Sequence, residues 1–213
     1  MIIVSLKTEA AGACLTKSEV ELSDGSLFSF RNCYLPAEIL NALANFTTIE
    51  GREITAEEEA GFRHASACLR AEKAALRLIA RAEQCTQGLS RKLQRRGHES
   101  PCVSAVISRL LELKLLDDRR FAQLWLESRL RLARSPRRLL VSLCGRGIDR
   151  DDGEAALKAA LDEETETAML ARFAKKYARK AARGGEAVTR SLKHLLKSEG
   201  FSQAAIARFL DVE

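Results

Sequence analysis

Side chains able to perform acid–base or metal chemistry are few and widely spaced in this 213-residue chain. The three histidines, His64, His98 and His194, lack the His-Glu-x-x-His spacing that places two zinc ligands on one helical face. We therefore expect surface or helix-capping histidines. The sequence also lacks phosphate-binding glycine loops and the Gly-x-Ser-x-Gly elbow of serine hydrolases. An enzyme would need a site that the sequence does not display, so we predict no catalytic residues and no cofactor.

Asp117 and Asp118 form the one carboxylate pair that suggests metal binding or acid–base catalysis. The pair follows the apolar residues Leu115 and Leu116 and precedes a predicted helix that begins near Arg119. A carboxylate at this position accepts hydrogen bonds from free backbone N–H groups and complements the positive end of the helix dipole. We interpret the pair as a helix cap.

The six cysteines are spread at long intervals and include no Cys-x-x-Cys pair. This spacing is unlike that of zinc sites and of small disulfide-stabilised secreted domains. We therefore expect buried, reduced thiols and no bound metal. The cysteines are Cys14, Cys33, Cys68, Cys85, Cys102 and Cys144.

Charge is distributed unevenly along the chain. Lys and Arg number 35 against 29 Asp and Glu, a formal net charge of +6. Residues 1–69 hold 5 basic and 10 acidic side chains (net −5), whereas residues 70–213 hold 30 and 19 (net +11). This asymmetry indicates a polyanion or an acidic protein surface as partner, although a merely solvated helical surface would have the same composition.

The chain shows no sequence signal for membrane insertion or export. No stretch approaches the roughly 18 uninterrupted apolar residues of a membrane span. The N-terminal segment reaches Lys7 before a signal-like apolar core develops. We expect a soluble, cytoplasmic protein.

Arginines are concentrated between residues 119 and 150. This segment holds nine arginines and no lysine, against the two acids Glu127 and Asp149. The planar guanidinium group favours bidentate contacts with phosphates or carboxylates. A second basic run over residues 172–183 has the spacing of one helical face, although a solvated face would explain part of it. The candidate binding residues are Arg119, Arg120, Arg129, Arg131, Arg134, Arg137, Arg138, Arg146, Lys175, Lys176 and Arg179.

The elements that position these residues change character at Thr55. Alternating residues at 2–6, 19–22 and 26–30 predict three strands, with Asp24-Gly25 as the hairpin turn between the last two. Pro36 opens a short helix. Thr55 and Glu58 have the spacing of a reciprocal N-terminal cap, and the remaining chain has helical periodicity.

Leucine and glycine repeat three times in the helical part. Leucines stand four and eight residues before each of Gly97, Gly147 and Gly200, and an apolar pair follows nine and ten residues after each glycine. Each repeat therefore holds a helix, a tight glycine turn and another helix, preceded by a third helix. We expect a mostly α fold of three-helix repeats in an elongated array. The expected divisions are a strand-rich region at 1–54 and repeats at 72–114, 115–162 and 163–213.

Two stretches carry a resemblance to a known family. The segment from Leu115 through Asp117-Asp118-Arg119-Arg120 to Arg129, and the segment from Ser135 to Ile148, resemble the signature of bacterial RecX regulatory proteins. The resemblance implies tandem three-helix repeats and no enzymatic activity. It also implies binding to the RecA recombinase, usually with inhibition of filament growth, strand exchange and ATP hydrolysis. Ser135 and Ser142 depart from the glycine and glutamate that the family often has there.

We therefore expect a non-catalytic, monomeric regulator that binds the RecA filament in DNA repair and the SOS response, with single- or double-stranded DNA as a further partner. The alternative is a stand-alone nucleic-acid-binding helical repeat protein. Each repeat embeds a helix-turn-helix pair, which is typical of DNA readers. The second such helix of the central repeat begins Asp151-Asp152, however, so contacts to DNA backbone or protein are expected rather than base reading.

Overall fold

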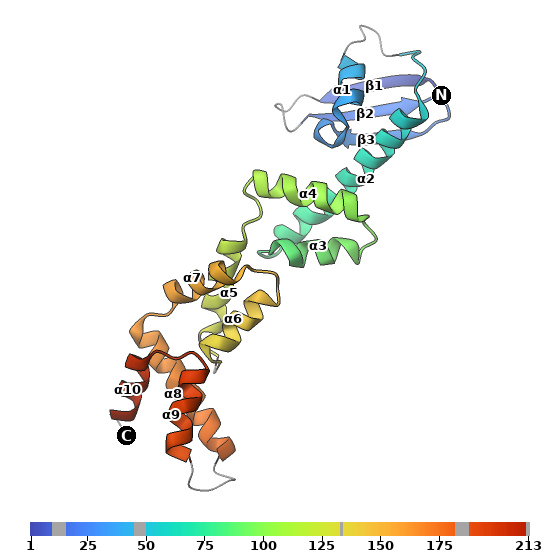
Figure 1. The fold of residues 1–213 in the computed structure, drawn as a ribbon. Helices are drawn as coiled ribbons and strands as arrows, with labels where there is room; N and C mark the ends of the chain where they lie inside the picture. Colours follow the sequence, from blue (N-terminus) through green and yellow to red (C-terminus); the bar gives the residue numbers. More distant parts are fainter. Residues whose placement is uncertain (10–15, 45–49, 133, 182–187, 212–213) are drawn as a thin grey trace. The chain divides into compact units, whose positions relative to one another are not determined.

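The computed structural model contains two compact units, each with its own hydrophobic core (Figure 1). The residues that it describes are 1–9, 16–44, 50–132, 134–181 and 188–211. The first unit comprises Met1–Glu83 and Leu89–Leu116, and the second comprises Gln84–Gly88 and Asp117–Glu213. The described chain is mostly helical with a small N-terminal sheet, which confirms the predicted fold class. None of its helices is both long and apolar enough to cross a membrane.

The sheet of the first unit is antiparallel with strand order β1-β2-β3. Its strands are β1 (Ile3–Glu9), β2 (Lys17–Leu22) and β3 (Leu27–Arg31). Gly25 in the β2–β3 turn has a φ of 82°, and the Asp24 carboxylate accepts a hydrogen bond from the Ser26 backbone at 2.9 Å. The Asp-Gly turn therefore lies where the sequence predicts it.

Helix α2 (Ala56–Ile79) is the long element that packs against the sheet. It begins with the predicted reciprocal cap between Thr55 and Glu58. Phe62 on α2 stacks on Phe30 of β3 with ring centroids 5.5 Å apart, and both rings are fully buried. The 3₁₀ helix η1 (Asn32–Tyr34) and α1 (Ala37–Ala44) connect β3 to this helix. Burial of these apolar rings holds the sheet on α2.

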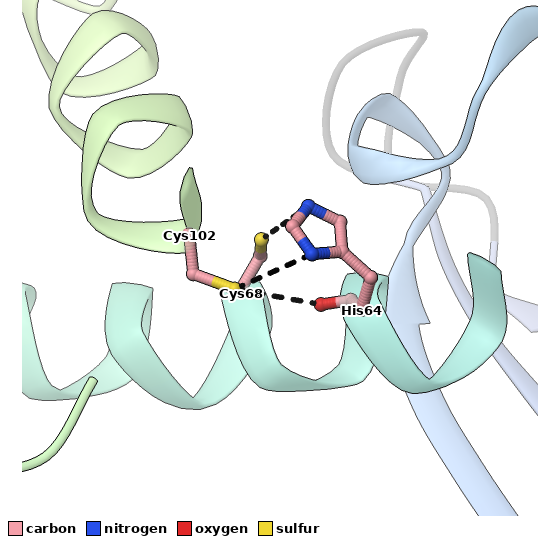
Figure 2. Close-up of side chains that lie close together, drawn as sticks. All are labelled: His64, Cys68 and Cys102. Carbon is pink, nitrogen blue, oxygen red and sulfur yellow. Dashed lines mark hydrogen bonds between the residues drawn. The ribbon is translucent and has the colours of Figure 1, made fainter. Parts of the chain in front are cut away.

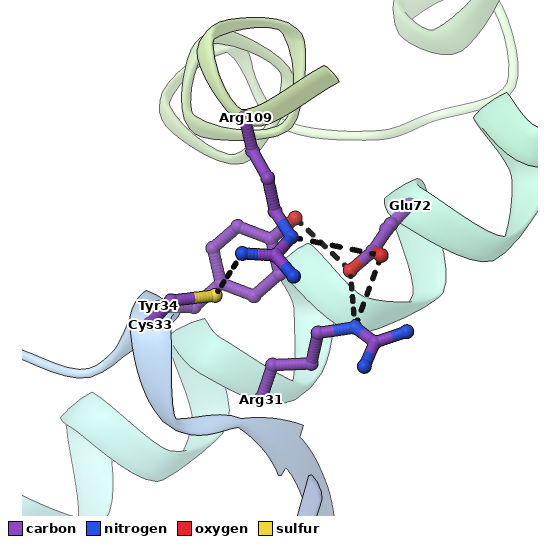
Figure 3. Close-up of polar contacts among 5 residues, drawn as sticks. All are labelled: Arg31, Cys33, Tyr34, Glu72 and Arg109. Atoms are coloured by element: carbon purple, nitrogen blue, oxygen red, sulfur yellow. Dashed lines mark hydrogen bonds and ion pairs between the residues drawn. The ribbon is translucent and has the colours of Figure 1, made fainter. Parts of the chain in front are cut away.

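A buried polar network joins the sheet side of the first unit to its helices (Figure 3). The Glu72 carboxylate on α2 accepts hydrogen bonds from Arg31 at 2.9 and 3.0 Å and from the Tyr34 hydroxyl at 3.1 Å. The Arg109 guanidinium lies 3.8 Å from the same carboxylate and donates to the Cys33 sulfur at 3.0 Å. Burial, with the adjacent Glu72 charge, raises the pKa of Tyr34 well above its usual value, so the phenol stays a donor.

Helices α3 (Thr86–Gln94) and α4 (Ser100–Glu112) follow α2. Ser100-Pro101 has the sequence pattern of a capping hydroxyl before a proline at the first helical position, which predicts that Ser100 caps α4. The structure instead begins the helix at Ser100 itself, with Glu99 at the capping position and no side-chain hydrogen bond there. Pro101 is thus the second helical residue. A backbone N–H at this position has no acceptor within the helix, so proline costs the helix no hydrogen bond there.

The second unit consists of helices whose apolar faces meet in one core. Trp125 is only 9% exposed and belongs to this core together with Leu126, Leu139 and Leu143. The helices are α5 (Asp118–Arg129), α6 (Pro136–Cys144), α7 (Arg150–Ala160), α8 (Glu163–Ala181), α9 (Val188–Ser198) and α10 (Gln203–Asp211).

The three repeated glycines have the same left-handed conformation. Gly97, Gly147 and Gly200 have φ values of 83°, 87° and 86°. In each turn the residue after glycine donates its backbone N–H to the carbonyl of the second repeated leucine. The pairs are His98 to Leu93 (3.2 Å), Ile148 to Leu143 (3.3 Å) and Phe201 to Leu196 (3.2 Å). The leucine–glycine spacing therefore encodes a helix-ending hydrogen-bond pattern.

Two of these turns also contact the start of an earlier helix: the Gly147 turn contacts α3, and the Gly200 turn contacts α6. A Cβ on Gly147 would lie 2.5 Å from the Cβ of Gln87, at the start of α3, within the second unit. A Cβ on Gly200 would lie 3.4 Å from the Arg137 backbone nitrogen, at the start of α6. The Gly147 and Gly200 turns are thus points of close contact as well as helix ends.

Candidate basic interface

A cavity of about 540 Å³ in the second unit gathers basic side chains from two helices and a loop. Arg134 precedes α6, Arg137 and Arg138 lie in its first turn, and Lys176 comes from α8. All four are among the candidate binding residues predicted from the sequence. The other lining residues are Val141, Ser142 and Glu199.

The first turn of α6 is held in place by the α9–α10 turn. Ser135 caps α6, accepting a hydrogen bond from the Arg138 backbone at 3.4 Å, and donates its hydroxyl proton to Glu199. The Arg137 backbone N–H donates to the Glu199 carbonyl at 3.0 Å, and its guanidinium donates to the Ser198 carbonyl at 3.2 Å. These bonds fix the backbone from which the cavity arginines project.

Electrostatics favour an anion at this cavity. Four basic side chains face one carboxylate, Glu199, which leaves a formal excess of three positive charges. Glu199 lies 3.6 Å from Arg138, whose side chain is still 65% exposed. The N-terminal end of α6 adds the partial positive charge of the helix dipole, although the N–H groups of Arg137 and Arg138 already have acceptors. Val141, 64% exposed, places an apolar surface beside these charges. A partner with carboxylate or phosphate groups next to apolar surface would match this combination.

Glu199 is the cavity residue that the sequence reasoning missed. It stands immediately before Gly200, as Arg146 stands immediately before Gly147. In the equivalent contact one repeat earlier, the Cys85 thiol donates to the Arg146 carbonyl at 3.4 Å. Alignment of the repeats on their glycines pairs Glu199 with Arg146, but the contact of each with the start of an earlier helix comes from the structure alone.

Arg129 and Arg146 lie against the ring of Trp125 instead of in the cavity. Their guanidinium carbons are 5.7 and 4.7 Å from the indole centroid. Arg146 also donates to the Ser142 carbonyl at 2.6 Å. Because both cations are half-buried and stacked on a core ring, they stabilise the second unit through cation–π contacts.

The remaining candidate residues are placed at separate points. Arg119 is exposed but pairs with Asp152 on α7 at 2.7 Å, and Arg120 is half-buried on α5. Arg131 lines a second cavity of about 350 Å³ that also contains Arg172 and Glu164. Lys175 is exposed on α8. The side chain of Arg179 lies outside the described residues.

Asp117 and Asp118 both accept backbone hydrogen bonds. Asp117 caps α5 through the N–H groups of Arg119 (2.9 Å) and Arg120 (3.0 Å), as the sequence predicts. Asp118 accepts the Thr86 N–H at 2.7 Å. The pair therefore organises helix starts in the second unit.

Replacement of Asp117 by Ala tests this role. We expect Asp117→Ala to lower the free energy of unfolding by about 1 kcal/mol, because two N–H groups lose their acceptor. Asp117→Asn should retain most of the stability, since asparagine caps about as well. Urea denaturation followed by the fluorescence of Trp125, which lies on the capped helix, measures the difference. Equal stability of all three proteins would contradict a capping role.

Comparison with known proteins gives one consistent family. Residues 71–110 match the model of the first three-helix domain of RecX, and residues 117–157 match that of the second. The regulatory protein RecX of Treponema pallidum (strain Nichols) is 34% identical over 164 residues, covering 76% of this chain and 97% of that protein. RecX of Halorhodospira halophila is 35% identical over 130 residues, which are 61% of this chain and 76% of that protein.

Solved structures agree on the fold. The crystal structure of a regulatory protein RecX matches with a TM-score of 0.71 and 17% identity, covering 99% of this chain and 98% of the other. The crystal structure of RecX from Lactobacillus salivarius matches with a TM-score of 0.56 and 20% identity, covering 69% and 96%.

Proposed function

Since this chain belongs to the RecX family of regulatory proteins, we propose that it is a non-catalytic regulator that binds the RecA recombinase filament. Binding inhibits the ATPase and strand-exchange activities of RecA. In this proposal the protein acts in the cytoplasm, as a monomer, on filaments assembled on DNA during repair and the SOS response.

The observation that carries the proposal is the basic cavity of the second unit. Four cations, Arg134, Arg137, Arg138 and Lys176, surround a single carboxylate next to the exposed side chain of Val141. The DNA of a RecA filament carries phosphates, and an acidic surface on RecA itself would suit guanidinium donors equally. The apolar neighbour favours a protein surface over phosphate alone, because phosphate recognition gains nothing from an exposed valine.

The repeats suggest how binding of this protein to the filament could regulate RecA. We propose that the segments 72–114, 115–162 and 163–213 act as successive three-helix repeats behind the strand-rich region 1–54. Basic side chains in more than one repeat could then contact neighbouring RecA subunits. A ligand shifts an equilibrium only by its difference in affinity for the two states. Inhibition therefore requires tighter binding to filaments in the non-growing state.

Neutralisation of the cavity cations tests this function. We expect the combined variant Arg134→Gln, Arg137→Gln, Arg138→Gln and Lys176→Gln to need about 100-fold more protein for half-inhibition of the RecA ATPase. Loss of two charge-assisted contacts worth about 1.5 kcal/mol each would suffice for this change. The measurements are ATP hydrolysis on single-stranded DNA and co-sedimentation with the RecA filament.

A matched control removes the same charge elsewhere. Arg77, Arg81, Arg95 and Arg96 are all exposed and lie outside the cavity. Their replacement by Gln lowers the net charge by the same four units, so we expect inhibition close to that of the unmodified protein. If both variants lose inhibition equally, general charge explains binding and the cavity assignment is wrong. If the cavity variant inhibits fully with an unchanged circular dichroism spectrum, the assignment is also wrong.

The alternative, a stand-alone nucleic-acid-binding protein, has a separate signature. The same arginines would then bind phosphates, and DNA affinity would fall steeply with salt. The discriminating experiment measures RecA ATPase inhibition at a salt concentration that abolishes DNA binding by this chain alone. Inhibition under that condition supports the RecA partner, and its loss supports the alternative.

A further inference from the structure

Three potential metal ligands converge in the first unit (Figure 2). His64 and Cys68 come from α2, and Cys102 comes from the first turn of α4. The Cys68 sulfur lies 3.5 Å from His64 Nε2, and the Cys102 sulfur lies 3.6 Å from His64 Nδ1. One ligand atom from each residue can be chosen so that all three lie within 4.8 Å of one another.

These separations are close to those of a tetrahedral zinc centre. With Zn–S near 2.3 Å and Zn–N near 2.0–2.1 Å, adjacent sulfur and nitrogen ligands are about 3.5 Å apart, and two sulfurs are about 3.8 Å apart. Each observed sulfur–nitrogen distance has about this length, but the two sulfurs face different ring nitrogens. A side-chain rearrangement is therefore needed to bring both sulfurs around one ion on one nitrogen.

Local structure explains the convergence. Cys68 follows His64 by four residues, which puts both on the same face of α2. Cys102 is the third residue of α4. Both sulfurs are buried, at 0% and 1% residue exposure. The ligands are therefore held by two packed helices rather than by mobile loops.

His64 connects the cluster to a cavity. It is half-buried and is the one residue of the three that lines this cavity of about 530 Å³, whose charged lining residues are Glu59, Arg63, Arg70 and Glu99. Glu99 directly precedes α4 and so lies near Cys102 in the chain. A site with three protein ligands leaves one coordination position for water or a carboxylate.

We propose that His64, Cys68 and Cys102 bind a single zinc ion, with the fourth position open to the Glu99 cavity. Thiolate and imidazole ligands select zinc over the hard cations magnesium and calcium. The ion would join the first turn of α4 to the middle of α2 and so stabilise the first unit. This proposal is independent of RecA binding, because its residues belong to the first unit and the basic cavity belongs to the second.

Proton release gives the proposal a further signature. Zinc binds the thiolate form of cysteine, so each ligand thiol that is protonated releases its proton when the ion binds. Zinc affinity should therefore fall as the pH is lowered.

The experiment uses the full chain, reduced with a phosphine and freed of metal with a chelator. Cobalt(II) is titrated first, because tetrahedral cobalt with thiolate ligands absorbs visible light strongly, and zinc is then added in competition. We expect one cobalt per chain, displacement by one zinc, and a higher midpoint of thermal unfolding with zinc. Measurement of zinc affinity over two pH units tests this proton release.

Variants assign the ligands. His64→Asn, Cys68→Ser and Cys102→Ser should each abolish the thiolate–cobalt spectrum, whereas Cys144→Ser, an exposed cysteine of the second unit, should leave it unchanged. His64 is half-buried, so His64→Asn remains informative if a buried-cysteine variant unfolds. A spectrum that is absent in the unmodified protein, or that survives all three substitutions, would overturn the proposal.

Discussion

Replacement of Glu72 by Ala is expected to lower the free energy of unfolding by about 3–5 kcal/mol. Glu72 is 2% exposed and is the shared acceptor for Arg31 and the Tyr34 hydroxyl, with Arg109 3.8 Å away. Its removal leaves two arginines without the carboxylate that balances them inside the first unit. Removal of one partner of a buried ion pair lowers stability more than replacement of both partners by apolar residues, because the remaining charge stays desolvated.

Two further variants separate charge from packing. Glu72→Gln keeps the shape and part of the hydrogen bonding, so we expect a loss between those of wild type and Glu72→Ala. Glu59→Ala removes a one-turn ion pair with Arg63, whose side chain is 71% exposed, and should change stability by less than about 1 kcal/mol. Denaturation followed by circular dichroism measures all three. Equal losses for Glu59→Ala and Glu72→Ala would show that the buried network contributes no special stability.

Replacement of Gly147 by Ala is expected to destabilise the second unit by about 2–5 kcal/mol. The positive φ of 87° costs an L-residue about 1–2 kcal/mol. The added Cβ would also lie 2.5 Å from the Cβ of Gln87, and relief of that overlap adds about 1–3 kcal/mol. Because Gln87 Cβ is attached directly to the backbone, rotation of the side chain cannot move it away.

Gly200→Ala is the matched control for this substitution. Gly200 has nearly the same φ, 86°, but its nearest neighbour would be 3.4 Å from the new Cβ. We expect the backbone penalty alone, about 1–2 kcal/mol. Trp125, the single tryptophan, lies in the same unit and reports both denaturation curves by fluorescence. If the two variants were equally stable, the contact between the Gly147 turn and the start of α3 would contribute nothing to the free energy of unfolding.

Features that depend on a few neighbouring residues could be predicted from the sequence. Thr55 with Glu58, Asp117 before α5 and the leucine–glycine spacing each specify a local hydrogen-bond pattern, and the structure confirms them. The same reasoning misplaced the start of α4, because either Glu99 or Ser100 can precede a proline in the first turn. The helical repeats and the family resemblance could be recognised from the sequence, because helical periodicity and short motifs do not depend on knowledge of the packing.

Contacts between distant side chains, in contrast, emerged only from the folded structure. The arginine run gave no means of telling that Arg134, Arg137 and Arg138 share a cavity with Lys176, whereas Arg146 stacks on Trp125. Spacing likewise gave no reason to place Cys102 beside His64 and Cys68, since the third ligand comes from another helix. Helical periodicity specifies which residues share a face, but the packing of one helix against another determines what that face contacts.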